Sequence, residues 1–170
     1  MFHPSSLLLT ALTAAASTNA LYFQFSPFVA GDYRLPSDSH LISFTVSNPT
    51  ADFAEGGPAP RNISIAWNGT DIPTCWTISD GSGYPYFARV TPDSYKSAEE
   101  FQLDVQEYHI YQAPEVFNVT AVPIVEGGGL GGYTCSQGGQ STVCTFQNEA
   151  KGFNVTVGRG GDPVQPSPLC

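Results

Sequence analysis

The sequence predicts an all-β protein, an antiparallel β-sandwich or barrel of about 8–9 short strands with few or no helices. Apolar residues recur at every second position in several segments, which is the spacing of strands with one buried face. The 17 glycines and 14 prolines favour frequent turns. Only residues 92–100 allow one short helical turn. At 170 residues, the chain fits a single domain.

Five segments alternate most clearly and place their apolar residues on one face. In one of them, Phe117, Val119 and Ala121 are expected to face the core and Asn118 the solvent. The five segments are 41–47, 62–68, 101–106, 117–121 and 153–157; weaker strand candidates are 22–28, 74–78, 86–91 and 143–147. We expect one β-sandwich domain over residues 21–158, followed by a Gly/Pro-rich tail, 159–170, that ends in a cysteine.

Residues 1–20 resemble a secretory signal peptide. An apolar stretch over residues 7–16 is too short to span a bilayer, and Thr18 and Ala20 are small residues at positions −3 and −1 of a cleavage site after Ala20. Cleavage after Ala16 is the alternative. No second apolar segment follows, so we expect a secreted, extracellular protein without a membrane anchor.

Glycosylation sequons support export. Asn62, Asn68, Asn118 and Asn154 each begin an Asn-x-Ser/Thr sequence, whereas Asn48 is followed by proline. The alternation places these four asparagines on the polar faces of their strands, where a glycan is accessible.

The cysteines predict two disulfides. An even number of cysteines in an exported chain implies a disulfide framework, and four cysteines allow three connectivities. Cys135 and Cys144 enclose a short Gly/Gln/Ser-rich turn, so we expect these two to pair. This pairing leaves Cys75 for Cys170, which would tie the tail to the domain.

The charge of the chain excludes two classes of partner. Six Lys and Arg residues against 15 Asp and Glu residues give a net charge of −9. Nucleic-acid binding requires a basic surface that neutralises phosphates, and anionic membranes likewise attract basic segments. We therefore expect neither nucleic acid nor a membrane as a partner.

Residue patterns of catalysis are lacking, so we expect a non-enzymatic binding protein with no catalytic residues, no metal and no cofactor. His40 and His109 lie outside any zinc-ligand spacing, and no Gly-x-Ser-x-Gly elbow is present. Adjacent or nearby carboxylates such as Asp104 and Glu107 diverge along a regular strand. An acid/base pair from distant strands, including His109, remains the alternative.

Five aromatic residues suggest a recognition surface. Exposed aromatic side chains on loops often bind partners. The alternative is that these side chains cover the ends of the core. They are Tyr84, Tyr86, Phe87, Tyr108 and Tyr111.

Four segments carry a resemblance to a known family. The strand 41–49, Leu-Ile-Ser-Phe-Thr-Val-Ser-Asn-Pro, resembles the opening strand of small secreted fungal proteins related to the major allergen of Alternaria. Cys75-Trp76, the phenylalanine-containing strand 101–105 and the late cysteines Cys135 and Cys144 follow in the same order. The resemblance covers residues 23–158. The chain differs in having one cysteine in the middle region, where the family usually has two.

The resemblance implies a compact β-sandwich or barrel that often dimerises and has no established enzyme activity. Members of the family resemble effectors and allergens, meet host defence proteins outside the cell, and in some cases carry small phenolic ligands. We therefore expect a fungal, allergen-like effector with a role in virulence, which binds a host extracellular protein or a small apolar ligand and can form a homodimer. A secreted hydrolase and a structural protein of the cell wall or surface are the alternatives.

Overall fold

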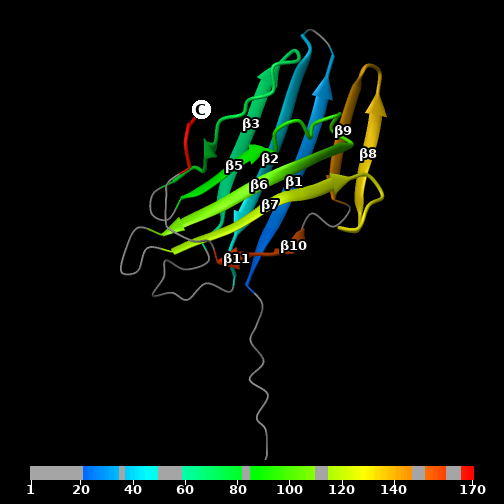
Figure 1. Ribbon diagram of the computed structural model, residues 1–170. Coiled ribbons are helices and arrows are strands. Elements are labelled where there is room, and N and C mark those ends of the chain that lie inside the picture. Colours follow the sequence, from blue (N-terminus) through cyan, green and yellow to red (C-terminus); the bar gives the residue numbers. More distant parts are fainter. Residues whose placement is uncertain are drawn as a thin grey trace, which may run out of the picture.

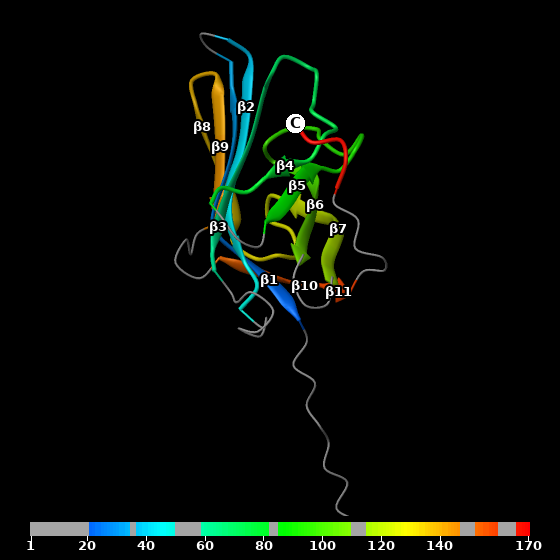
Figure 2. The ribbon, with the colours of Figure 1, turned by 90° about the vertical axis from the view of Figure 1, so that its left-hand side faces the viewer.

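Two antiparallel sheets pack face to face in the computed structural model, which describes residues 21–34, 37–49, 59–81, 85–109, 115–146, 152–159 and 166–170. Figure 1 shows the strands of one sheet crossing in front of those of the other, and Figure 2 shows the two layers from the side. The described residues contain no helix. The predicted all-β fold class is confirmed. The expected signal peptide, residues 1–20, lies outside the described residues.

The first sheet is built around the long strand β1. Its path runs β3-β2-β1-β9-β8, and β10 also pairs with β1. The 12-residue β1 reaches two partners on one side, because its first residues pair with β10 and residues 29–33 pair with β9. The strands are β1 (Tyr22–Tyr33), β2 (Ser39–Ser47), β3 (Arg61–Asn68), β8 (Tyr133–Gly138), β9 (Ser141–Phe146) and β10 (Phe153–Thr156).

The second sheet has the order β11-β7-β6-β5-β4. Its longest pairing joins β6 and β7, and β5 continues the sheet on the other side of β6. The segment between β5 and β6, where one helical turn was expected, forms turns and an isolated bridge between Ser97 and Glu100. The strands are β4 (Thr77–Ile78), β5 (Tyr86–Val90), β6 (Glu100–His109), β7 (Glu115–Val125) and β11 (Gly158–Arg159).

Aromatic rings fill the space between the sheets. Phe28 of β1 stacks on Phe44 of β2 at 5.5 Å between ring centroids, and its ring lies 6.4 Å from that of Phe101 in the other sheet. Phe28, Phe44 and Phe101 are all at most 2% exposed. The expected alternation along the strands thus produces one continuous apolar core.

A β-bulge in the second sheet changes the register of β7. Leu103 pairs with Val122 and Val105 with Val119, so two residues of β7 lie opposite Asp104. The backbone N–H of Ala121 donates to Asp104 Oδ1 at 2.9 Å, and Ala121 has a φ of 52°. Ala121 is therefore exposed and Val122 buried, so the expectation that Ala121 faces the core is wrong. Strict alternation could not include the extra residue.

Two disulfides join the expected cysteines. Cys135 of β8 lies directly opposite Cys144 of β9 in the ladder, and these two are bonded. Cys75 is bonded to Cys170. The end of the chain also pairs with Trp76, whose N–H donates to the carbonyl of Pro168 at 2.9 Å and whose carbonyl accepts from Cys170 N–H at 3.0 Å.

Candidate ligand-binding site

Three side chains form a row across one end of the first sheet. Asp32 of β1 lies opposite His40 of β2, and His40 lies opposite Trp67 of β3. All three follow the inward-facing parity of their strands, such as that of Ile42 and Phe44 in β2. The pairing register therefore brings a carboxylate, an imidazole and an indole together where the core reaches solvent.

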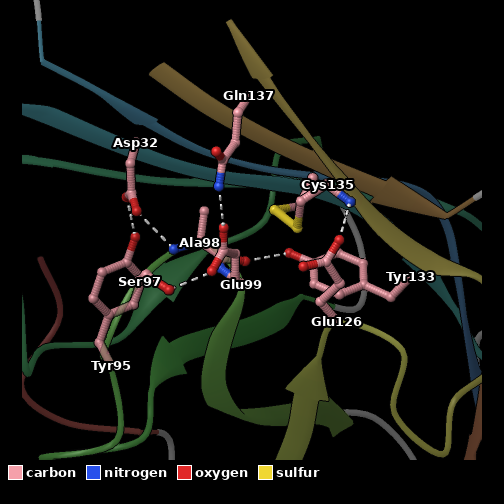
Figure 3. The surroundings of a disulfide bond; sticks show 10 residues. Asp32, Tyr95, Ser97, Ala98, Glu99, Glu126, Tyr133, Cys135 and Gln137 are labelled. Atoms are coloured by element: carbon pink, nitrogen blue, oxygen red, sulfur yellow. Dashed lines mark hydrogen bonds between the residues drawn. A yellow bond between two sulfur atoms is a disulfide. The ribbon is translucent and has the colours of Figure 1, made fainter. Parts of the chain in front are cut away.

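Asp32 accepts three hydrogen bonds. The N–H of Ala98 donates to Oδ2 at 2.8 Å, the Tyr95 hydroxyl donates to Oδ1, and His40 Nδ1 lies 2.7 Å from the same oxygen. Figure 3 shows Tyr95 and Ala98 both directed at Asp32. Because an ionised carboxylate can only accept, Nδ1 of His40 carries the proton in this contact.

The surroundings of Asp32 favour its charged form. Burial by itself raises the pKa of the carboxyl, but the hydrogen bonds from Tyr95, Ala98 and His40, together with the charge of His40, outweigh burial and lower the pKa below its ordinary value. Burial and the neighbouring carboxylate of Asp32 raise the pKa of the Tyr95 hydroxyl. Tyr95 therefore keeps its proton and remains a donor to Asp32.

Three aromatic rings pack against one another above this carboxylate. The imidazole of His40 stacks on the indole of Trp67, with ring centroids 4.9 Å apart and planes 13° apart. Tyr95 meets both edge-on, at 4.8 Å from Trp67 and 5.7 Å from His40. Such edge-to-face and offset contacts are favourable for aromatic pairs. The three rings form one rigid wall.

A cavity of about 310 Å³, which we call the inner pocket, opens against this wall. Apolar atoms come from Trp67, Tyr95 and Ile72. At the rim, Asp38 supplies a carboxylate and Lys96 an ammonium that also pairs with Glu100. Nε2 of His40 lies 3.9 Å from Asp38 Oδ1. Gly69 and Thr70 complete the lining.

Hydrogen bonds from β8 also hold the segment that carries Tyr95. Tyr133 donates its hydroxyl proton to the carbonyl of Ala98 at 2.6 Å, and Gln137 Nε2 donates to Glu99 Oε1 at 3.2 Å. Figure 3 shows these contacts beside the disulfide of Cys135. The backbone N–H of Cys135 donates to Glu126 Oε1 at 3.0 Å. Asp32 of β1 accepts hydrogen bonds from Tyr95 and Ala98, so both β1 and β8 hold this segment. The wall of the inner pocket is thus preorganised.

The site has the chemistry of a binding pocket with one proton-transfer group. An imidazole that donates Nδ1–H to a carboxylate is oriented and keeps its other nitrogen for a ligand. Among the described residues, no three His, Cys, Asp or Glu side chains are arranged to hold a metal ion. In the same part of the chain, no helix is long and apolar enough to cross a membrane.

The expected recognition surface is only partly described. Tyr86 and Phe87 are each 1% exposed, so the expectation that they form an exposed surface is wrong. Their strand β5 lies between β4 and β6, and the ring of Tyr86 contacts Phe23 of the first sheet at 5.7 Å. Tyr108 is half-buried. Tyr84 and Tyr111 lie outside the described residues.

The alternative acid/base residues are buried within the second sheet. Asp104 forms an ion pair with Arg89 Nε at 2.9 Å and accepts from Thr91 at 2.8 Å. Glu107 is 1% exposed and accepts from the side-chain amide of Asn48 at 2.7 Å. The side chain of His109 lies outside the described part of the structure. Asp104 and Glu107 therefore have structural contacts.

The sequons lie where the alternation places them, as far as they are described. Asn62, Asn68 and Asn154 are exposed. The side chain of Asn118 lies outside the described residues.

Sequence reasoning did not identify Asp32, Trp67 and Tyr95 as site residues, and it considered His40 only to exclude it as a zinc ligand. The alternation does place His40 on the same face of its strand as Ile42, and Trp67 on the same face as Ile65. The missing information was the register between β1, β2 and β3, which determines which side chains of different strands meet.

No family model matches the sequence, and no curated protein matches it.

Proposed function

We propose that this protein is a secreted, disulfide-bonded binding protein that takes a small aromatic ligand with polar substituents into the inner pocket. The observation that carries the proposal is the wall formed by His40, Trp67 and Tyr95, with the charged groups of Asp38 and Lys96 at its rim. The role is non-enzymatic and effector-like, as expected for the fungal secreted proteins that the sequence resembles.

The size and lining of the inner pocket favour a small ligand. Its volume of about 310 Å³ lies at the lower end of the roughly 300–1,000 Å³ typical of small-molecule sites. Rigid aromatic walls bind planar apolar groups, and a few polar groups at the rim orient them. A phenol or phenolic acid has both features, because its ring packs on the wall while its oxygens reach Lys96 or Thr70.

The two disulfides support an extracellular location. Disulfides form and persist in oxidising compartments and are rare in the cytosol. Both pairs are closed in this chain, and among the described residues no cysteine is free.

Tryptophan fluorescence tests the proposal. In a Trp76→Phe background, emission reports mainly on Trp67, because these are the two tryptophans of the chain. The oxidised protein is titrated with phenol, a neutral phenolic ester, a phenolic acid and a phenolic amine. We expect saturable quenching by at least one compound, with a Kd on the order of 10 μM to 1 mM for a ligand of this size.

Two isoleucines provide a matched pair of variants. Ile72→Ala removes three carbon atoms from the half-buried lining of the inner pocket and should weaken binding by about tenfold, since each contributes about half of the ~0.8 kcal/mol of a fully buried methylene. Ile78→Ala removes the same atoms from β4, where the side chain is 50% exposed, and should leave the Kd unchanged. Equal effects of the two variants, or no saturable signal with any compound, would overturn the proposal.

Hydrolysis is a second candidate function. A single observation favours it, the hydrogen bond between Asp32 and His40. An oriented imidazole can act as a general base. The phenolic ester in the same panel distinguishes the two functions. Turnover that disappears in His40→Gln would establish catalysis, whereas saturable binding without turnover would support the binding function.

A further inference from the structure

A second row of side chains crosses the same three strands on the outer face of the first sheet. Tyr33 of β1 lies opposite Ser39 of β2, and Ser39 lies opposite Asn68 of β3. The next row on this face is Gly31, Leu41 and Ala66, paired in the same way. Because side chains alternate between faces, this outer pair of rows backs onto the inner row of Asp32, His40 and Trp67.

Small residues leave a depression in this outer face, which we call the outer hollow. The ring of Tyr33 lies over Gly31, where a Cβ atom would come within 2.6 Å of the Tyr33 hydroxyl oxygen. Ser39 and Ala66 have short side chains, and Leu41 is half-buried at the base. The result is a hollow of about 370 Å³ that is lined by Tyr33, Leu41, Ala66 and Asn68, with atoms of Ser39, His40 and Trp67.

We propose that the outer hollow binds the first sugar of an N-linked glycan carried by Asn68. Asn68 begins the sequon Asn68-Gly69-Thr70, is exposed, and lines the hollow itself. The ligand is therefore covalently attached at the edge of its own binding site. The inference relies on the secretory route included in the proposed function and does not need a ligand in the inner pocket.

The dimensions of the sheet fit an N-acetylglucosamine ring. Neighbouring strands are about 4.7–4.9 Å apart, so Tyr33 lies two strand spacings from Asn68 with only Ser39 between them. The Tyr33 ring is turned along β1 toward Gly31, so a sugar attached to the Asn68 amide and laid over Ser39 and Leu41 reaches it. The C–H face of a pyranose is apolar and packs on an aromatic ring, while its hydroxyls face the Ser39 hydroxyl and solvent.

The other sequon asparagine of β3, Asn62, has different neighbours from Asn68. It shares the outward face of β3, but its Oδ1 accepts from Thr45 at 2.7 Å and its Nδ2 donates to Asp80 at 2.9 Å. The residue opposite Asn62 is Thr45, a small polar side chain. Asn68 instead lies at the end of a row that closes with a tyrosine.

Thermal unfolding of protein from a eukaryotic secretory host tests the inference. One sample is trimmed with an endoglycosidase that leaves a single N-acetylglucosamine on each asparagine, and another is treated with an amidase that removes the whole glycan. We expect the trimmed protein to retain its Tm and the second sample to lose about 2–4 °C, the shift typical of one such interaction in a domain of this size.

When the protein is made in the secretory host, the Asn68→Gln variant should have a Tm lower than the parent by the same few degrees. The Asn154→Gln variant, changed at an exposed position on β10, should keep the Tm of the parent. In unglycosylated, refolded protein, Asn68→Gln should have the Tm of the parent, which separates loss of the sugar from loss of the amide. Equal behaviour of Asn68→Gln and Asn154→Gln would overturn the inference, as would an unmodified Asn68 in the mass of the corresponding peptide.

Nuclear magnetic resonance of the trimmed protein locates the sugar directly. Ring currents of Tyr33 should shift resonances of the Asn68-linked sugar upfield from those of the Asn154-linked sugar, and Tyr33→Leu should abolish the difference. Coincident resonances would overturn the inference. Phenol titrations use unglycosylated protein, so failure of the inner pocket and failure of the outer hollow are observed separately.

Discussion

His40 of β2 lies directly opposite Trp67 of β3, and their ring planes are 13° from parallel at a centroid distance of 4.9 Å. One residue away in each strand, Ser39 lies opposite Asn68 on the other face. A single pairing register thus builds both the inner pocket and the outer hollow. A slip of one residue would exchange the two faces and remove both.

Asp32→Asn should weaken the protein and flatten its response to acid. Because the pKa of Asp32 is lowered in the folded state, its contribution to the free energy of unfolding is complete above the ordinary value of 3.8 and is lost as the pH falls through the lowered folded pKa. Loss of charged hydrogen bonds should reduce this free energy by about 1–3 kcal/mol at pH 7. Urea unfolding at pH 7, 5, 4 and 3 measures both effects.

Asp71→Asn is the control for removing one negative charge, because Asp71 is exposed in the loop after β3. At pH 7 its free energy of unfolding should equal that of the parent. A difference between parent and Asp32→Asn that stays constant from pH 7 to pH 3 would contradict the predicted linkage.

The two disulfides should contribute unequally. Cys75 and Cys170 are 95 residues apart in sequence, and Cys135 and Cys144 are 9 residues apart. In the chain-entropy account, the longer loop restricts the unfolded chain more, by about 2 kcal/mol in the free energy of unfolding. Guanidinium unfolding of the double variants Cys75→Ala/Cys170→Ala and Cys135→Ala/Cys144→Ala compares them. A larger loss from the second pair would show that native contacts outweigh loop closure.

Ala121→Gly should stabilise the protein. Ala121 has a φ of 52° in the β6–β7 bulge, where a side chain is strained and glycine is not. We expect a gain of about 0.5–1 kcal/mol, since the relief of strain exceeds the added entropy of the unfolded chain. Ala66→Gly, in the regular strand β3, should lose a similar amount. Thermal unfolding of both variants checks the sign, and a loss at both positions would disprove the strain.

The bulge also shows where local pattern reasoning stops. Alternation places Leu103 and Val105 correctly, because the core requires apolar side chains at every second residue of β6. It places Ala121 wrongly, because the carboxylate of Asp104 holds the backbone N–H of Ala121 and accommodates an extra residue in β7. Asp104 belongs to β6, so its contact leaves no periodic signal in the sequence of β7.

The candidate site could not be predicted from local patterns either, because its contacts also join distant parts of the chain. Tyr95 lies in an irregular segment between β5 and β6, 63 residues after its hydrogen-bond partner Asp32. The cysteines were accessible to reasoning, because the turn between Cys135 and Cys144 is short and leaves one remaining pair.

Local sequence patterns predict the all-β class, the buried face of most strands, both disulfide pairs and the outward position of the described sequons. These features follow from period-two hydrophobicity, turn residues and cysteine spacing, which act over a few residues. Only the tertiary structure brings Asp32, His40, Trp67 and Tyr95 together. It also places Tyr33 and Asn68 at the two ends of one row across three strands. Those contacts depend on the register between strands and on the path of a loop, both of which are determined by packing of the whole core.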